Sequence, residues 1–221
     1  MFESQKHTFW QALLITIVIF SMGIIFGVVL ENWRTNKVDN LYKYSEIDLL
    51  DVKLQSEIYS MGNFNCGKAV EKNIAFADRV YEEAKQLEEY EKSSILTQDL
   101  KISHKKYDIL RTILLLNSNK IKEQCNVSYQ EVVYFYRYNN VDLNLKEEER
   151  VFSRLLEELK NDKGDKVLLI PIAADNNITS VDLILDKYNI LQKDLPVILI
   201  DGKIKISELK SIDDLKKYFS N

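Results

Sequence analysis

Cys66 and Cys125 are the only cysteines among the 221 residues of this chain, and thiol chemistry is the chemistry that its residue types most directly allow. Two helical patterns of apolar residues lie on either side of a break at Ser93 and Ser94. The two cysteines are equally far from that break to within two residues. Residues equidistant from the turn of an antiparallel hairpin lie side by side. We therefore expect Cys66 and Cys125 to be neighbours at the open end of this hairpin and to form a disulfide.

Two other interpretations of the cysteine pair stay open. In a reducing cytosol, two buried thiols would be preferred over a disulfide. The pair could also exchange electrons, as in a thiol-disulfide oxidoreductase that uses Cys66 and Cys125. A metal site is disfavoured because His7 and His104, the two histidines, do not fall at ligand spacing from a cysteine. We expect no metal ion and no cofactor.

A long apolar run near the N-terminus predicts a membrane anchor. Residues 9–30 carry no formal charge and would span about 33 Å as a helix, enough to cross a bilayer. No A-x-A-like cleavage site comes after the run, so we expect it to be retained, with residues 1–8 as a short tail. Trp10 and Trp33 bracket the run as interfacial aromatic residues do. The predicted location is the cell membrane, with a single pass and the lipid bilayer as a partner.

The charges beside this run do not decide the orientation by themselves. Lys6 and the terminal amine precede it, whereas Arg34, Lys37 and Lys43 come after it, which mildly favours a cytoplasmic body. A short tail before an uncleaved apolar run is typical of a signal anchor that exports the rest of the chain, and a disulfide also favours export. We expect an extracytoplasmic body.

Gly23 and Gly27 form a G-x-x-x-G pattern within the apolar run. Such a pair lets two membrane helices approach closely and could support a homodimer. Glycine is common in membrane helices, so a lipid-facing pair without a partner explains the pattern equally well.

Two N-x-S/T triplets begin at Asn126 and Asn177, in a predicted linker and a predicted loop. An exported body could be glycosylated at both. Triplets of this kind also arise by chance in a chain rich in asparagine.

The region between the anchor and the hairpin predicts a helical, coiled-coil-like stalk over residues 31–61. Apolar residues recur there in steps of three and four, and no proline or glycine interrupts the pattern before Gly62. Residues 62–65 suit a helix stop and a turn. The predicted hairpin then occupies residues 66–124.

Residues 126–221 alternate between strand and helix patterns in the order βαβαββα. Asn144 to Glu147 resembles a capping box that starts the first helix, and Ser211 caps the last one. Asp201 and Gly202 form a tight turn. The expected strands are 131–138, 166–174, 195–200 and 203–206, and the expected helices begin near residues 144, 179 and 211.

This order, with residues 194–202 as its most specific stretch, resembles the thioredoxin superfamily, in which a cis-proline opens the third core strand and a hairpin and helix come next. The similarity covers about residues 120–221 and is greatest to the membrane-anchored thioredoxin-like proteins of small-genome archaea. The resemblance implies a cis peptide bond before Pro196. It also implies that the second strand lies at a sheet edge, where Pro171 is tolerated. The predicted fold class is α+β, with an N-terminal transmembrane helix, a helical stalk, an antiparallel hairpin and a thioredoxin-like domain.

In active members of this superfamily, the loop after the first strand carries Cys-x-x-Cys at a helix N-terminus, where the thiol pKa is lowered. The matching residues, 139–144, contain no cysteine, so we expect no catalytic residue there. The backbone beside the cis-proline resembles a strand edge on which peptides can lie. The peptide-binding candidates are therefore Leu195, Pro196, Asn140 and Asp142, although Pro196 could equally serve the fold alone.

These patterns predict a membrane-anchored, redox-inactive thioredoxin-like protein that binds another protein or organises a membrane complex. A thiol-disulfide oxidoreductase and a purely structural spacer remain as alternatives. Nucleic acid is not an expected partner, because the net charge is −4 and no basic stripe is present. The sequence also has no Gly-rich phosphate loop and no paired-carboxylate signature.

Overall fold

The computed structural model describes residues 2–93, 98–139, 142–208 and 211–219, and within these ranges it describes no side chains at 2–8, 32–45, 48, 88–93 and 98–100. The fold is mostly helical and contains one small four-stranded sheet. The chain divides into two compact units, Met1–Asp51 and Val52–Asn221. This division falls inside the predicted stalk, and each unit is described by itself below.

The first unit consists of the N-terminal part of helix α1, whose bounds are Phe2–Met61. Within it, Phe9–Glu31 is long and apolar enough to cross a membrane. Every side chain of this segment is exposed, including Trp10. A helix that is apolar on all sides and exposed suits lipid as its solvent. The predicted apolar helix is thus present, one residue longer than expected.

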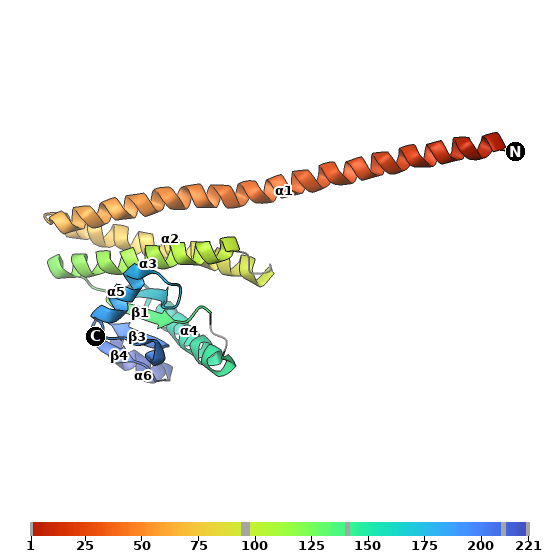
Figure 1. Cartoon of the computed structure of the whole chain (residues 1–221). Coiled ribbons are helices and arrows are strands. Elements are labelled where there is room, and N and C mark those ends of the chain that lie inside the picture. The colour runs from red at the N-terminus through yellow and green to blue at the C-terminus, as the bar shows by residue number, and fades with distance from the viewer. Residues whose placement is uncertain (1, 94–97, 140–141, 209–210, 220–221) are drawn as a thin grey trace. The chain divides into compact units, whose positions relative to one another are not determined.

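The second unit begins with the last part of α1 and a helical hairpin. Helix α1 ends at Met61, and Gly62 and Asn63 then take left-handed φ angles of 72° and 57°. Helices α2, Cys66–Ser93, and α3, Gln98–Gln124, come next. Tyr107 Oη of α3 donates to Glu83 Oε2 of α2 at 3.4 Å, and α2 and α3 run side by side in opposite directions (Figure 1). The predicted break at Ser93 and Ser94 falls partly outside the described residues, which omit 94–97.

The remaining chain forms the sheet and its helices. The strand order is β2-β1-β3-β4, with β1 parallel to β2 and the other two neighbouring pairs antiparallel. The described helices and strands of this region occur in the predicted order. Strand β3 begins directly after Leu195 and Pro196, whereas we expected these two residues to be its first. Their bounds are β1 Gln130–Tyr136, α4 Leu143–Lys163, β2 Val167–Ala173, α5 Thr179–Lys187, β3 Val197–Ile200, β4 Ile204–Ile206 and α6 Ile212–Lys216, with 3-10 turns η1 Gly164–Lys166, η2 Gln192–Asp194 and η3 Lys217–Phe219.

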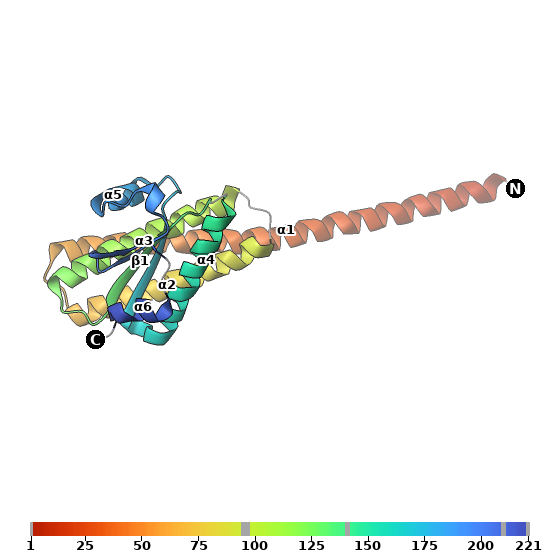
Figure 2. The ribbon, with the colours of Figure 1, turned by 90° about the horizontal axis from the view of Figure 1, so that it is seen from below.

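The sheet carries apolar side chains on both faces. Helices α4 and α6 cover one face, while α5 lies on the opposite side next to α3 (Figures 1 and 2). Strand β1 lies inside the sheet and its middle five residues are buried. The core on the α4 and α6 side consists of Val132, Tyr134, Phe152, Leu156, Leu159, Val167, Ile198, Ile200, Ile206, Leu215 and Phe219. Burial of this continuous apolar surface provides the main stabilisation of the sheet domain.

Pro171 lies in β2, which is an edge strand as expected. Ala174 N donates to Tyr136 O of β1 at 2.8 Å. Because N–H groups alternate in direction along a strand, those of residues 173 and 171 would point away from β1. Ala173 N does so, and it donates to Asp108 Oδ1 of α3 at 3.1 Å. The missing N–H of Pro171 therefore removes no hydrogen bond from the β1–β2 ladder.

The start of α4 differs from the predicted capping box. The N-cap residue is Asp142, whose Oδ1 accepts from Asn144 N at 2.8 Å, so Asn144 is already inside the helix. A carboxylate interacts favourably with the positive end of the helix dipole, which gives Asp142 an advantage over the neutral Asn144. Gly164 ends α4 and Ser211 caps α6, both as predicted.

Candidate functional site

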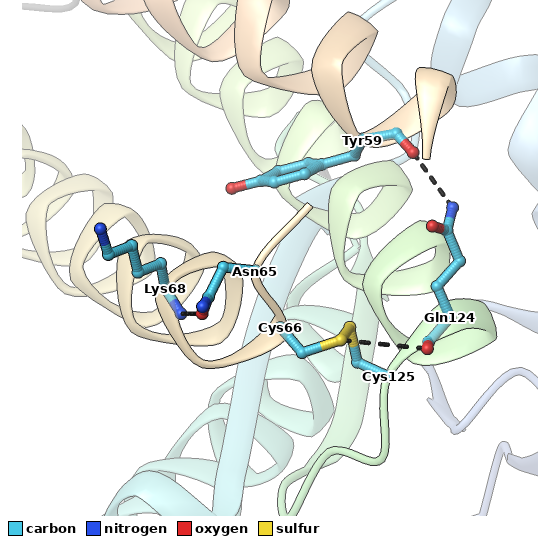
Figure 3. The surroundings of a disulfide bond; sticks show 6 residues. All are labelled: Tyr59, Asn65, Cys66, Lys68, Gln124 and Cys125. Atoms are coloured by element: carbon cyan, nitrogen blue, oxygen red, sulfur yellow. Dashed lines mark hydrogen bonds between the residues drawn. A yellow bond between two sulfur atoms is a disulfide. The ribbon is translucent and has the colours of Figure 1, made fainter. Parts of the chain in front are cut away.

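Cys66 and Cys125 form a disulfide with a Cα–Cα distance of 5.6 Å (Figure 3). Cys66 is the first residue of α2, and Cys125 comes directly after α3. The bond closes the open end of the hairpin, as the spacing of the two cysteines predicted. No other cysteine exists in the sequence, so this bond contains all the thiol chemistry that the chain can perform.

The two halves of the disulfide differ in exposure. Cys125 is 8% exposed and packs with Tyr59, Ala69 and Ile121, whereas Cys66 is exposed. Gln124 Nε2 donates to Tyr59 O at 3.1 Å, and Cys66 Sγ lies 3.9 Å from Gln124 O (Figure 3). A thiolate from solvent would therefore reach the Cys66 sulfur more readily than the Cys125 sulfur.

A lysine at the end of α3 adds a second link beside the disulfide. Lys120 Nζ donates to both the carbonyl oxygen and the hydroxyl of Ser56 at 3.1 Å, and also to Ser60 Oγ. The last turns of α1, the start of α2 and the end of α3 are thus connected by covalent and polar contacts.

The position of Cys66 also has a chemical consequence. It lies at the N-terminus of α2, where Asn65 Oδ1 accepts from Lys68 N at 3.0 Å (Figure 3). The positive end of a helix dipole stabilises a thiolate. If the disulfide were reduced, Cys66 would be the more reactive of the two thiols.

The proline end of the sheet is the second candidate site. The Leu195-Pro196 peptide bond is cis, as the family resemblance implies. Leu195 is 3% exposed and Pro196 is also buried. Arg137 Nη1 donates to Leu195 O at 3.2 Å, and Arg137 Nη2 donates to Gln192 O. The carbonyl group that an added peptide strand could use already has a partner within the chain.

Carboxylate side chains accept hydrogen bonds from backbone N–H groups in and beside the loop after β1. Asp175 accepts from Tyr138 N at 2.7 Å and from Asn139 N at 2.8 Å. Asp142 is exposed, and its side chain caps α4. Asn140, another peptide-binding candidate, lies outside the described residues. The sequence of this loop supplies no nucleophile for disulfide exchange.

Buried acidic groups that the sequence did not single out lie where α3 meets the sheet. Asp108 accepts from Ala173 N and from Asn176 Nδ2 at 2.6 Å, and Arg111 Nη1 lies 3.6 Å from its carboxylate. Burial raises the pKa of Asp108 above its ordinary value, and the nearby Arg111 opposes this effect. These contacts fasten α3 to the free edge of β2.

Glu131, at the start of β1, is 1% exposed, and its Oε2 atom has no hydrogen-bond partner among the described residues. Burial raises the pKa of Glu131 to about 7, opposed by a hydrogen bond from Ser118 and the charge of Lys122. The apolar residues of α3 recur in steps of three and four, and Asn117 interrupts this pattern one residue before Ser118. This interruption was the only sign in the sequence of a polar cluster at this place. Asn117 and Ser118 are both buried.

The predicted dimerisation glycines and glycosylation asparagines all lie at exposed positions. Gly23 and Gly27 have no described atom within 4 Å of a Cβ built on them, apart from their own helix backbone and chain neighbours. Asn126 and Asn177 are exposed and lie outside helices and strands. Among the residues that the structure describes, no group of three or more His, Cys, Asp or Glu side chains could hold a metal ion. Dimerisation and glycosylation stay predictions.

Comparisons with known proteins give only a weak likeness to solved structures. No family model matches the chain, and no curated protein matches it. Among solved structures, the chain is similar to the crystal structure of thioredoxin O2 from Arabidopsis thaliana in the oxidized state. The identity is 20%, the match covers 42% of this chain and 73% of that chain, and the TM-score is 0.30.

Proposed function

We propose that this chain is a single-pass membrane protein whose residues 126–221 form a thioredoxin-like domain that binds or organises other proteins without dithiol exchange. The apolar segment Phe9–Glu31 supports the membrane anchor by length and composition. The disulfide between Cys66 and Cys125 supports an oxidising, extracytoplasmic location for the body.

The thioredoxin-like assignment rests on the sheet. Its order β2-β1-β3-β4, with a parallel β1–β2 pair and β2 at the edge, agrees with the minimal sheet of that superfamily. The β3–β4 hairpin and α6 come next in the expected order. A fold without its usual thiols can still serve recognition, because fold and activity are separable.

The location of the disulfide is the main support for the proposal that this domain does not exchange thiols. Cys125 lies before the first residue of β1, whereas the loop that would carry catalytic thiols lies after the last residue of β1. A seven-residue strand is about 23 Å long, so the two places are separated by the length of the sheet. A disulfide at one end cannot use a substrate held beside Pro196 at the other.

The topology and the bond are tested together by labelling in intact cells. A membrane-impermeant maleimide is applied to cells that produce the full chain, before and after treatment with a reductant. We expect labelling only after reduction, first at the exposed Cys66 and more slowly at the buried Cys125, with Cys66→Ser/Cys125→Ser as the unlabelled control. Labelling without reduction would contradict the disulfide, and labelling that requires permeabilised cells would contradict export.

The binding role is tested by crosslinking in native membranes. We expect a reproducible protein partner that is recovered with the wild type. Arg137→Ala frees Leu195 O, so a peptide that adds to this strand edge should be retained more strongly by that variant. Arg154→Ala, a change of the same kind at an exposed position of α4, is the matched control. No reproducible partner would favour a structural spacer instead.

An oxidoreductase that uses Cys66 and Cys125 is the second candidate function. It is favoured by the exposure of Cys66 at the N-terminus of α2. Under this alternative, the purified full chain should cycle under mild reductant and reduce a test disulfide over many turnovers, and Cys125→Ser should accumulate a mixed disulfide at Cys66. A structural bridge should resist mild reduction and show no turnover.

A further inference from the structure

A cavity of about 450 Å³ lies at the end of the sheet where β1 and β2 begin. Gln130 and Val167, the first residues of these two strands, line it. Other walls come from the connection between α3 and β1, the end of α4 and the C-terminal turn η3. The cavity is therefore at the opposite end of β1 from Pro196, and it has the size of a small-molecule site.

Lysine dominates the charge of this cavity. Lys122, Lys163, Lys166 and Lys217 line it, and Asp201 is the one acidic residue in its lining. The whole chain has a net charge of −4, so this local excess of positive charge opposes the overall balance. A concave surface of one sign with low-dielectric walls focuses the field and concentrates ions of the opposite sign.

Two of these lysines are not neutralised. Lys122 pairs with Asp201, and Lys217 pairs with Asp214 at 2.7 Å. Lys163 and Lys166 form no ion pair with any residue that the structure describes. They lie on either side of Gly164, whose φ of 56° lets the chain turn sharply at the end of α4.

Lys163 makes no capping hydrogen bond at the end of α4 among the described residues. Cations near a helix C-terminus often serve only to satisfy its last carbonyl groups and dipole. Lys160 and Lys163 both lie in the last turn of α4, and Lys160 Nζ donates to the C-cap carbonyl Gly164 O and to Val167 O of β2, both at 3.0 Å. Lys163 Nζ makes no hydrogen bond to any residue that the structure describes. Lys163 is therefore available for another anion.

We propose that this cavity binds a small phosphate-bearing anion, with Lys163 and Lys166 as its main charge partners. Lysine recognises phosphate as a point charge, and an ammonium group gains more from an anion in a half-enclosed cavity than in open water. Gln130 and Tyr218 add polar groups to the same walls. The phosphate belongs either to a soluble compound or to an anionic lipid headgroup.

The test uses the full chain in nanodiscs of phosphatidylcholine, titrated with inorganic pyrophosphate by calorimetry. The variant K163Q/K166Q removes both charges and, at these two sites, disturbs no described ion pair. The variant K101Q/K105Q removes two charges from exposed positions of α3 and is the matched control. Thermal unfolding of each variant without pyrophosphate shows whether it is folded.

We expect saturable binding to the wild type and to the control, weakened by about tenfold or more in K163Q/K166Q. A second arm replaces part of the phosphatidylcholine with phosphatidic acid and omits pyrophosphate. Thermal stabilisation by phosphatidic acid that K163Q/K166Q alone loses would assign the phosphate to a lipid headgroup. Absence of binding in both arms, or equal weakening in the two variants, would overturn the proposal.

Discussion

Asp108 of α3 and Asn176, which comes after β2, are joined by a hydrogen bond of 2.6 Å between two buried side chains. The same carboxylate accepts from Ala173 N of the edge strand. An exposed strand edge is prone to pair with another chain. In this protein, a side chain of α3 occupies part of that edge.

Replacement of Asp108 by alanine should destabilise the protein strongly. It would leave Ala173 N and Asn176 Nδ2 without their acceptor and Arg111 without its ion-pair partner, and such losses cost about 2–4 kcal/mol in buried sites. Urea denaturation followed by circular dichroism measures the effect. Asp186→Ala, at an exposed position of α5, should change stability by less than about 0.5 kcal/mol. Equal losses in the two variants would show that the buried contacts of Asp108 contribute little.

Glu131 should make stability depend on pH. Burial raises its pKa from 4.5 to about 7 in the folded chain. Between these values the folded state binds more protons than the unfolded state, so the free energy of unfolding should fall as pH rises. The full loss is about 3 kcal/mol at about 1.4 kcal/mol per pKa unit.

The variant Glu131→Gln should lose this part of the pH dependence, because the amide does not titrate. Relative to wild type, it should gain stability between about pH 5 and about pH 8 in urea denaturation. Glu123→Gln, at an exposed position of α3, is the control and should follow the wild type. A stability difference that is constant with pH would contradict the role of Glu131.

Loss of the disulfide should lower the stability of the second unit. Cys66→Ser/Cys125→Ser opens a loop that spans 59 residues, which corresponds to about 4 kcal/mol in the chain-entropy model. Chemical denaturation of the full chain with and without reductant provides the measurement. The reduced wild type should match the double variant. An unchanged midpoint would indicate that Lys120, Gln124 and the apolar cluster hold the hairpin without the bond.

Substitution of Gly23 and Gly27 by isoleucine should weaken any association of the apolar helix with a second copy. A close helix contact in lipid requires small residues on the facing sides. Crosslinking in membranes, with Ala12→Ile as a matched change within the same helix, reports the dimer fraction. If that fraction stays the same in Gly23→Ile/Gly27→Ile, the two glycines face lipid.

Much of the architecture could be predicted because its causes are local. The apolar run at residues 9–30, the three- and four-residue periodicity of the helices and the turn at Asp201 and Gly202 depend on neighbours within a few positions. The pairing of Cys66 with Cys125 results from symmetry about a turn, which requires only that the two helices are antiparallel. The start of α4 was misplaced because Asp142 and Asn144 both suit a cap at this distance.

The sequence alone therefore determined the order of helices and strands, the apolar helix, the cysteine pairing and the absence of a thiol in the loop after β1. Only the tertiary structure decided that Arg137 bonds to Leu195 O, that Asp108 holds the edge of β2 and that Glu131 is buried with a raised pKa. Only the tertiary structure also places Lys122, Lys163, Lys166 and Lys217 in the walls of one cavity. The reason is physical: these relationships join residues far apart in the chain, and packing sets their distances and burial, which hydrophobic periodicity does not encode.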